Sequence, residues 1–378
     1  MAESAIPDTQ RLVDYFLSLV QIDSPSFEEH AIAELLERDL QALGLTTRND
    51  KSGPNGTGNL IGTMQGSGGM RLAICAHMDT VEPSRGVRPS VDEGVIRSDG
   101  TTVLGADCKA GLAITIEALR TVVERNVPHG AIEVVFTYGE ERGHAGSKTL
   151  DVSTLQSDMV IVADGVGSPG TVISESPSYD SFRAVIHGIA AHAGLEPEKG
   201  ISAISVAADA IRLMPLGRID ESTTSNVGFI RGGTARNAVP DRVEIEGEAR
   251  SLHRDKLEAL TSSISQAVQS AAAHAGASAD FSVTREYTGY RMDRDDPSVV
   301  VVLKAAEALG LRASFEATGG GSDANTFNER GLPSIALGIG MQQPHTLEEW
   351  ITVDDLAKSA ELLVAIIAEA AAVSREEQ

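Results

Sequence analysis

The sequence predicts an α/β domain with a largely parallel sheet, and this domain is interrupted in the sequence by a smaller, inserted α+β domain. Through residues 59–163, short continuously apolar stretches alternate with a stretch of helical spacing, which is typical of buried parallel strands joined by helices. Between residues 178 and 290 the order of elements changes to strand–helix–strand–strand–helix–strand, the ferredoxin-like order. The chain of 378 residues is also roughly two to three times the length of a typical ~150-residue domain, so at least two folding units are expected.

The first 45 residues are expected to hold two helices. Apolar residues recur at helical spacing over residues 12–19 and 32–40, on either side of a helix-breaking segment that contains Pro25. Within that segment, Ser26 and Glu29 have the spacing of a capping box. The strands expected next lie at residues 59–64, 72–76, 132–138 and 159–163, with a long helix at residues 110–125.

The inserted domain has its own predicted elements. Its strands are expected at residues 181–188, 225–231, 243–251 and 279–286, and its helices at residues 202–214 and 253–273. The α/β order then resumes with a helix at residues 298–309, a strand at residues 334–338 and a final helix from Asp354. The predicted division is therefore a first part of the α/β domain at residues 1–177, the inserted domain at 178–290 and a second part of the α/β domain at 291–378.

The charge composition restricts the class of partner. The sequence has 54 Asp and Glu against 31 Lys and Arg, a formal net charge of −23, and its 42% of hydrophobic residues suffices for real cores. Such an acid excess argues against nucleic acid or an anionic membrane as the main partner, although it selects no substrate. The two cysteines, Cys75 and Cys108, fit a reducing compartment, and neither a signal peptide nor a membrane span is visible, so a cytoplasmic location is expected.

Ionisable residues lie beside the ends of predicted strands and at the start of the long helix. They are His77, Asp79, Asp107, Glu140, Glu141, Asp164 and His345. Open α/β sheets bind their ligands at the carboxyl ends of the strands, so these side chains are expected to converge. Two imidazoles with three or four carboxylates suit Zn²⁺ or Mn²⁺. Taken singly, each residue has a plainer interpretation; Asp107, for example, could simply cap its helix.

Short motifs at these positions resemble those of the M20 metallopeptidase family. They are His-Met-Asp-Thr at residues 77–80, Leu-Gly-Ala-Asp-Cys-Lys-Ala-Gly at 104–111, Gly-Glu-Glu at 139–141 and Ala-Asp-Gly at 163–165. Stretches at residues 319–325, 338–341 and 344–346 are most similar to the peptidase T (tripeptidase)-like branch of that family. The motifs occur in family order, and the resemblance implies a dinuclear-metal exopeptidase domain with an inserted ferredoxin-like lid domain.

The resemblance also implies a set of metal ligands. Two Zn²⁺ ions per chain are expected, with Mn²⁺ or Co²⁺ as substitutes. His77 and Asp164 would hold one ion, Glu141 and His345 would hold the other, and Asp107 would bridge the pair.

Two further carboxylates are expected to serve catalysis. Asp79, two residues after His77, would accept the imidazole N–H and so orient the ring. Glu140 would be the general base that activates the metal-bound water for attack on the scissile amide.

In the lid domain, the resemblance points to His192, Asn237 and Arg250 as substrate-binding residues, and Arg291 is a further candidate for binding a peptide carboxylate. His192 is expected on a loop, and in the family such a histidine often acts from the lid of a partner subunit, so a homodimer through the lid is an option. The plainer interpretation is an ordinary turn for Asn237 and a solvated strand position for Arg250. His274 lies in a nearly identical string but ends a helix, so a structural role is expected for it.

Two other features bear on the function. Cys108 stands where peptidase T-like sequences usually carry a second Asp, and it is either a buried, inert thiol or an influence on metal preference. Residues 165–170 formally match G-x-G-x-x-G, but residues 174–179 are expected to form a loop rather than a helix, so a dinucleotide site is rejected.

The function implied by the resemblance is the hydrolysis of short peptides, as in a tripeptidase or aminopeptidase. The alternative within the same chemistry is an amidohydrolase that deacylates N-acyl amino acids with the same metal core. A catalytically silent, peptide-binding relative is a third interpretation, although Glu140 and all five ligand positions are present. The preferred substrate side chains do not follow from one sequence.

Overall fold

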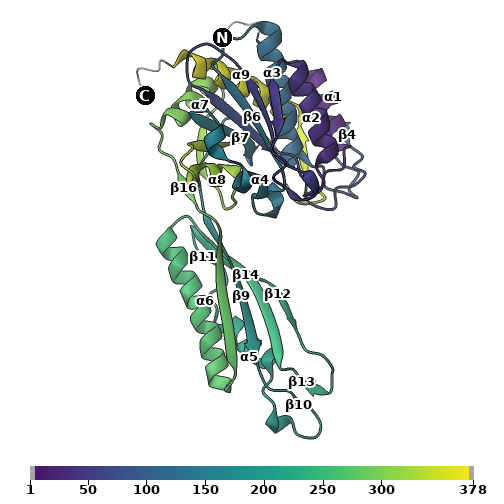
Figure 1. Cartoon of the computed structure of the whole chain (residues 1–378), viewed down its shortest axis with the longest axis vertical. Coiled ribbons are helices and arrows are strands. Elements are labelled where there is room, and N and C mark those ends of the chain that lie inside the picture. Colours follow the sequence, from purple (N-terminus) through teal and green to yellow (C-terminus); the bar gives the residue numbers. More distant parts are fainter. Residues whose placement is uncertain (1–4, 374–378) are drawn as a thin grey trace. The chain divides into compact units, whose positions relative to one another are not determined.

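A computed structural model describes residues 5–373 (Figure 1). The chain divides into two compact units. The first unit comprises the residues up to Ser174, Arg291–Ala317 and the residues from Ser322, and the second comprises Glu175–Tyr290 with Thr318–Gly321.

The first unit is built on a nine-stranded sheet. In spatial order its strands are β1 (Thr46–Asn49), β2 (Leu60–Met64), β6 (Ile132–Thr137), β3 (Leu72–His77), β7 (Met159–Gly165), β18 (Ser334–Gly338), β8 (Thr171–Ser176) and β16 (Tyr290–Arg291), and β17 (Ser314–Ala317) pairs with β8. The four central strands, β6, β3, β7 and β18, are parallel, and every residue of β3 and β6 is buried. Continuously apolar strands arise because both faces of such a sheet are covered. The predicted α/β class with a mainly parallel sheet is therefore confirmed.

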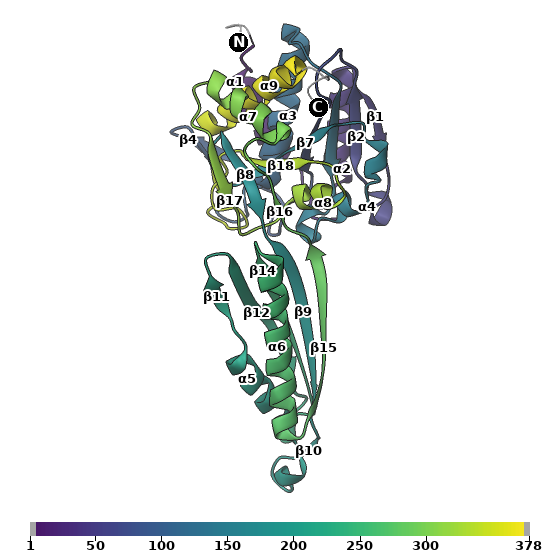
Figure 2. The same cartoon turned by 90° about the vertical axis from the view of Figure 1, so that its left-hand side faces the viewer.

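Helices cover both faces of this sheet, as Figure 2 shows. They are α1 (Thr9–Val20), α2 (His30–Ala42), α3 (Ala106–Arg125), α4 (Ala145–Thr149), α7 (Pro297–Ala308), α8 (Asp323–Glu329) and α9 (Val353–Ala372). Helices α1, α3, α7 and α9 pack against one another, whereas α4 packs with α8, which contacts β7 and β18. The predicted apolar stripe of α1 is fully buried at Leu12, Phe16 and Leu19.

A small three-stranded sheet joins two distant segments of the first unit. Its order is β19 (Trp350–Thr352), β5 (Val95–Arg97) and β4 (Ser90–Asp92). Trp350 pairs with Arg97, and Ile351 pairs with the fully buried Ile96. The sheet therefore ties the hairpin that precedes α3 to the chain that follows His345, and the sequence pattern did not predict it.

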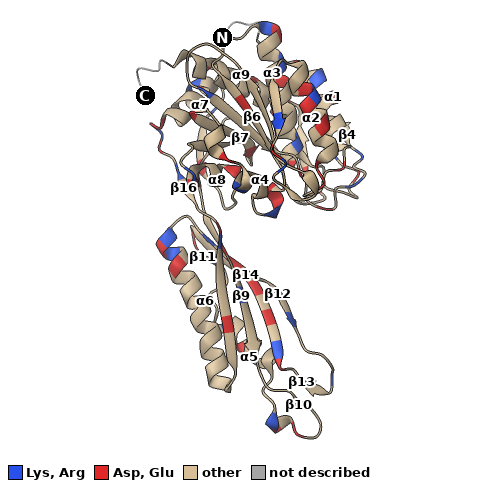
Figure 3. Cartoon of the chain, in the orientation of Figure 1, with Lys and Arg blue, Asp and Glu red and all other residues tan. Residues whose placement is uncertain are grey.

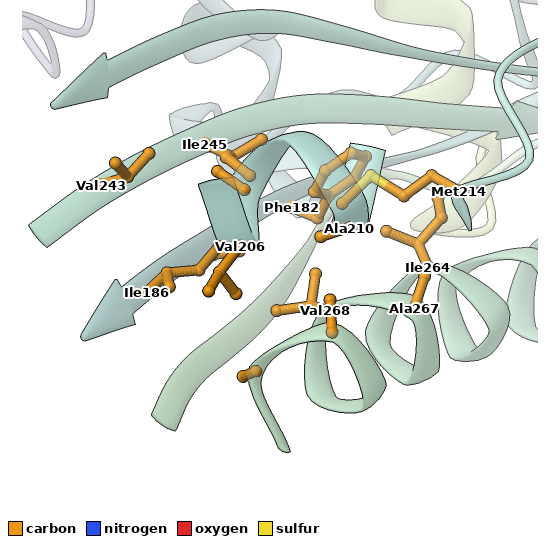
Figure 4. Packing of buried hydrophobic residues seen from close by; sticks show 14 of the residues in the cluster. Phe182, Ile186, Val206, Ala210, Met214, Val243, Ile245, Ile264, Ala267 and Val268 are labelled. Atoms are coloured by element: carbon orange, nitrogen blue, oxygen red, sulfur yellow. The ribbon is translucent and has the colours of Figure 1, made fainter. Parts of the chain in front are cut away.

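The second unit has a five-stranded antiparallel sheet. The order of the sheet is β11 (Gly217–Asp220), β12 (Thr223–Gly232), β14 (Arg242–Ser251), β9 (Ser178–His187) and β15 (Ser278–Tyr287). Helices α5 (Ala203–Leu213) and α6 (Arg254–Ala275) pack against it, and β10 (Ala191–His192) pairs with β13 (Ala238–Val239). Phe182, Ile186, Val243, Ile245 and Ile264 meet in its core (Figure 4). Burial of each such large apolar side chain contributes roughly 1.5–3 kcal/mol.

Two local predictions were wrong. Residues 174–179 form no loop, because β8 extends to Ser176 and β9 begins at Ser178. Ser26 and Glu29 form no capping box: α2 begins at His30, its N-cap Glu29 makes no side-chain cap, and Glu29 Oε1 instead accepts the backbone N–H of Phe27 and of Gly139. Tertiary partners therefore compete successfully with the local cap.

Acidic residues are spread over elements of both units rather than gathered in one (Figure 3). Many pair with arginine at the surface; Arg183, for example, lies 2.6 Å from Glu244. Within residues 5–373, no helix combines the length and the apolar character that crossing a membrane requires.

Candidate metal centre

The carboxyl ends of the parallel strands carry the ionisable residues of the first unit. His77 is the last residue of β3, Asp164 lies near the end of β7, and Glu140 and Glu141 form a short 3₁₀ turn directly after β6. Because His77 pairs in register with Thr137 of β6, these strands end at the same edge of the sheet.

Two residues reach this edge from other elements. Asp107 lies in the first turn of α3, where its backbone angles are not helical. His345 lies on the loop between β18 and β19, with its backbone in the left-handed region at φ 64°.

The five predicted ligands fall into two groups that share Asp107. In the first group, His77 Nε2 lies 2.9 Å from Asp107 Oδ1 and 3.6 Å from Asp164 Oδ1. In the second group, His345 Nε2 lies 2.8 Å from Glu141 Oε1 and 3.2 Å from Asp107 Oδ2. The potential ligand atoms of each group lie within 4.8 Å of one another. The structure thus brings all five side chains together.

The electrostatics of this cluster favour a bound cation. Burial and the neighbouring carboxylates raise the pKa of Asp164, and hydrogen bonds to Asp107 and Glu141 raise the pKa of His345 to about 10. Hydrogen bonds with His345 and His77 lower the pKa of Asp107, whereas burial raises the pKa of Glu141 as it does that of Asp164. An acid that resists ionisation beside an imidazole that resists deprotonation indicates excess negative charge in a small volume. Among the ion pairs of residues 5–373, none joins Lys or Arg to these carboxylates. Imidazole and carboxylate donors without a cationic side chain fit a divalent metal.

Asp79 is a fully buried carboxylate behind the cluster. Its Oδ1 accepts the backbone N–H of Glu140 at 2.9 Å, and its Oδ2 accepts the N–H of Glu141 at 3.2 Å and the hydroxyl of Ser26 at 2.6 Å. His77 Nδ1 lies 2.9 Å from the backbone carbonyl of Asp79 and 3.4 Å from its carboxylate. The backbone carbonyl is thus the nearer acceptor for the imidazole, and the carboxylate chiefly holds the turn that carries Glu140 and Glu141.

Glu140, the predicted base, is 8% exposed. Burial, followed by the charges of Asp164 and Asp323, raises its pKa well above the usual range. His144, which is also buried, places Nε2 at 3.3 Å from Glu140 Oε1, while Nδ1 of the same ring lies 3.4 Å from Thr326 Oγ1. The base is therefore flanked by an imidazole that sequence reasoning missed, because nothing in the spacing of His144 distinguishes it from a surface histidine.

Two further buried acids were missed as well. Asp323, in the segment at residues 319–325, accepts the hydroxyls of Thr137 and Ser147 at 2.5 Å each. Glu349, four residues after His345, is 1% exposed and accepts two backbone N–H groups at the start of α3. Its partners are 242 and 244 residues away, so no local pattern could reveal them.

The second unit contains three of the four predicted substrate-binding residues. His192 lies on β10, a two-residue strand rather than the expected loop, where it pairs with Ala238. Asn237 directly precedes β13, and its carbonyl accepts the N–H of Ala193 at 2.9 Å. His192 and Asn237 are therefore neighbours, and both are exposed. His274 lies in the last turn of α6, before the left-handed Gly276, as its structural interpretation predicted.

Arg250 lies toward the other end of the same unit. It lies eight positions along β14 from Arg242, about 26 Å at the rise of an extended strand. Arg242 pairs with His187, which lies four positions before the start of β10. The guanidinium of Arg250 lies 4.5 Å from the ring centre of Tyr179 and 3.0 Å from Glu248, and its Nε is buried without a hydrogen-bond partner. The second unit thus does not bring Arg250 to His192. Arg291, in the first unit, is exposed, with Asp293 at 4.0 Å.

Cys108 is completely buried, and its thiol lies 3.0 Å from the carbonyl of Ala163. Burial raises its pKa well above the usual range, which disfavours the thiolate that binds metals. The thiol nevertheless lies within the first ligand group, inside 4.8 Å of the donor atoms of His77 and Asp164.

Comparisons with known proteins show the family of the chain. The model of Peptidase family M20/M25/M40 matches residues 73–369. The uncharacterized protein YqjE of Bacillus subtilis is 43% identical over 96% of this chain and 99% of that protein, and Peptidase T of Vibrio parahaemolyticus is 27% identical over 94% and 88%. The crystal structure of aminopeptidase PepT from Bacillus cereus matches with 43% identity and a TM-score of 0.88, over 97% of this chain and 99% of that one. A tripeptidase from Staphylococcus aureus matches with 38% identity and a TM-score of 0.93, over 97% and 100%.

The chain therefore belongs to peptidase family M20/M25/M40, and the class that its fold and site define is a metal-dependent peptidase. Within that family it is a peptidase T-like member, because peptidase T proteins recur among its relatives and both PepT and a tripeptidase share its fold at 38% identity or more. The predicted resemblance is confirmed.

Proposed function

We propose that the chain is a dinuclear, zinc-dependent hydrolase of short peptides. His77 and Asp164 would hold one cation, Glu141 and His345 would hold the other, and Asp107 would contribute to both. The observation that carries this proposal is the sharing of Asp107 between two groups of donor atoms, with one oxygen directed to each histidine. A single-metal site has no need of a carboxylate placed in this way.

The residues of the chain provide the remaining parts of the reaction. Divalent cations in this site supply Lewis-acid chemistry that polarises a peptide carbonyl and makes water nucleophilic near neutral pH. Glu140 accepts the proton of the attacking water and returns it to the leaving amine, which its position beside Glu141 and its burial support. Asp79 keeps the Glu140 turn in place through the two backbone N–H groups, so that base and ligand hold a constant separation.

The substrate is a short peptide, in keeping with the names of the PepT and tripeptidase relatives. His192, Asn237, Arg250 and Arg291 are proposed to contact it. The exposure of His192 and Asn237 and their adjacency on β10 and β13 support a joint role for these two.

A homodimer through the second unit, which serves as the lid, remains a proposal. The edge of the sheet at β12 supports it. On one side of β12, β11 pairs only with Thr223–Ser225, whereas on the other side β14 pairs along the strand. An edge of this kind accepts a further strand. A cytoplasmic location likewise remains a prediction.

The proposal is tested by assaying di- and tripeptides with free, acetylated or amidated termini beside N-acyl amino acids, together with the metal content of the protein. We expect two Zn²⁺ per chain and turnover of tripeptides with free termini. Turnover of N-acyl amino acids with none of any peptide would establish the deacylase instead, and no turnover of either with full metal content would establish a silent relative.

Variants in the same assay separate the roles of the residues. Glu140→Ala should retain its metals and lose turnover by roughly 10²–10⁴-fold, the usual contribution of a general base. His192→Ala should lower activity, whereas the matched variant His274→Ala should leave it unchanged. Near-normal activity of Glu140→Ala would remove Glu140 as the base.

A further inference from the structure

A buried carboxylate connects the two ligand loops that come from opposite ends of the sequence. Glu349 Oε2 accepts the backbone N–H of Gly105 at 2.8 Å, and Glu349 Oε1 accepts that of Asp107 at 3.0 Å. Its side chain is 1% exposed. These N–H groups belong to the start of α3, where the helix leaves backbone donors without internal partners and favours a negative group.

Glu349 and His345 belong to one closed loop. Gln342 and Trp350 exchange backbone hydrogen bonds of 2.9 and 3.1 Å at its base, and the N–H of Glu349 donates to the carbonyl of Thr346 within it. Inside this loop His345 is half exposed, whereas Glu349 is inserted into the protein. The position of the exposed imidazole therefore depends on how the loop is anchored, and Glu349 anchors it.

Glu349 also holds Asp107, which is proposed to bind the same cation as His345. The N–H held by Glu349 belongs to Asp107, whose own Oδ2 lies 3.2 Å from His345 Nε2. One side chain thus sets the relative position of two groups that must converge on one ion. Fixing the orientation of ligands in this way raises the affinity of a metal site, and removing such a partner costs typically about 10–100-fold in affinity.

We propose that Glu349 is a positioning residue that sets the spacing between Asp107 and His345 and thereby the affinity of the cation site these two share. The inference rests on the proposed metal site and deepens it. Glu349 contacts neither substrate nor metal in this role; it acts through the backbone of Asp107 and through the loop of His345.

Glutamine tests this role because it keeps the shape of the side chain and removes one acceptor. In Glu349→Gln, one of the two N–H groups of α3 faces an amide N–H₂ instead of an oxygen, so both bonds cannot persist. The neighbouring Glu348 supplies a matched control, since Glu348→Gln makes the same change of side chain at an exposed position one residue away.

The measurement is Zn²⁺ binding by the metal-free full-length chain in competition with a chromophoric chelator, with thermal unfolding of each metal-free protein in parallel. We expect two sites in the unmodified chain. In Glu349→Gln, one site should weaken by about 10–100-fold while the other changes little, and kcat should recover at saturating Zn²⁺. The Zn²⁺ affinities of Glu348→Gln should equal those of the unmodified chain within about twofold, which is well below the effect expected when a contact that orients a ligand is lost.

Several outcomes would overturn the inference. Equal Zn²⁺ affinities in Glu349→Gln and the unmodified chain would do so, as would equal weakening in both glutamine variants. A lower unfolding temperature of metal-free Glu349→Gln with unchanged affinity would assign Glu349 a merely structural role. If Glu349→Gln does not fold, Glu349→Asp takes its place, and unchanged affinity there has the same meaning. An unmodified chain that binds no Zn²⁺ would instead overturn the proposed function, and this inference with it.

Discussion

The carboxylate of Asp79 should be intolerant of conversion to an amide. It has two acceptor oxygens and three donors that use them: the N–H of Glu140, the N–H of Glu141 and the hydroxyl of Ser26. In Asp79→Asn the amide oxygen can remain opposite the N–H of Glu140. The NH₂ then occupies the place of Oδ2, where the hydroxyl of Ser26 can turn to accept from it but the N–H of Glu141 cannot.

The expected loss of stability follows from these three hydrogen bonds. The N–H of Glu141, whose bond to Asp79 is partly buried, loses its acceptor, which costs about 1–3 kcal/mol, and the remaining bonds lose their charge assistance. We expect the free energy of unfolding of Asp79→Asn to fall by about 2 kcal/mol, within that range. The turn that carries Glu140 and Glu141 shifts with its lost bond, so kcat should fall by roughly 10–100-fold, equivalent to about 1.4–2.7 kcal/mol of activation free energy.

The assay combines urea unfolding with the kcat for a tripeptide at saturating Zn²⁺. Ser26→Ala is the matched control, because it removes one donor to Asp79 and leaves both backbone bonds intact. Its effects should be clearly smaller. The reasoning is refuted if Asp79→Asn equals the unmodified chain in both measurements, or if Ser26→Ala equals Asp79→Asn.

Two further predictions concern the stability of the protein. Arg11→Met should lower the free energy of unfolding in urea by about 3 kcal/mol, because the buried carboxylate of Glu117 loses the guanidinium that now donates to it at 2.7 and 2.8 Å. The control Arg85→Met breaks only exposed ion pairs and should cost less than about 1 kcal/mol. Equal effects of the two substitutions would contradict the argument. The hydrogen bond from Arg183 lowers the pKa of Glu244 from its usual 4.5 to about 2, so its stabilising contribution is present above pH 4.5 and is lost as the pH falls toward 2. Arg183→Ala should return that pKa toward its usual value in an NMR titration of the carboxylate, and an unchanged titration would contradict the assignment.

Much of the fold was predictable because its cause is local. The central strands have continuous apolar runs, since helices cover both of their faces, and the stripe of Leu12, Phe16 and Leu19 records the burial of α1. The convergence of His77, Asp164 and the Glu140 turn was predictable for a related reason: neighbouring parallel strands end at one edge.

The wrong predictions have a common physical origin. Ser26 and Glu29 have the spacing of a helix cap, but Ser26 donates to Asp79 and Glu29 accepts from Gly139. A buried backbone group without a partner costs more than a surface cap contributes, so the distant partner takes precedence. The two-residue strand β10 was missed because its pairing with β13, rather than its own composition, makes it a strand.

What the sequence determined by itself was the α/β class, the positions of the strand-end residues and, through its motifs, the membership in the M20 family. Those properties depend on periodicity and on residues close together in the chain. The folded structure was needed to show that the two oxygens of Asp107 face different histidines, and that the Asp79 carboxylate supports a turn more than an imidazole ring. It also decided that Glu349, rather than its neighbour Glu348, is buried against α3. Those facts depend on contacts between residues as many as 244 positions apart, and no pattern within one segment can encode them.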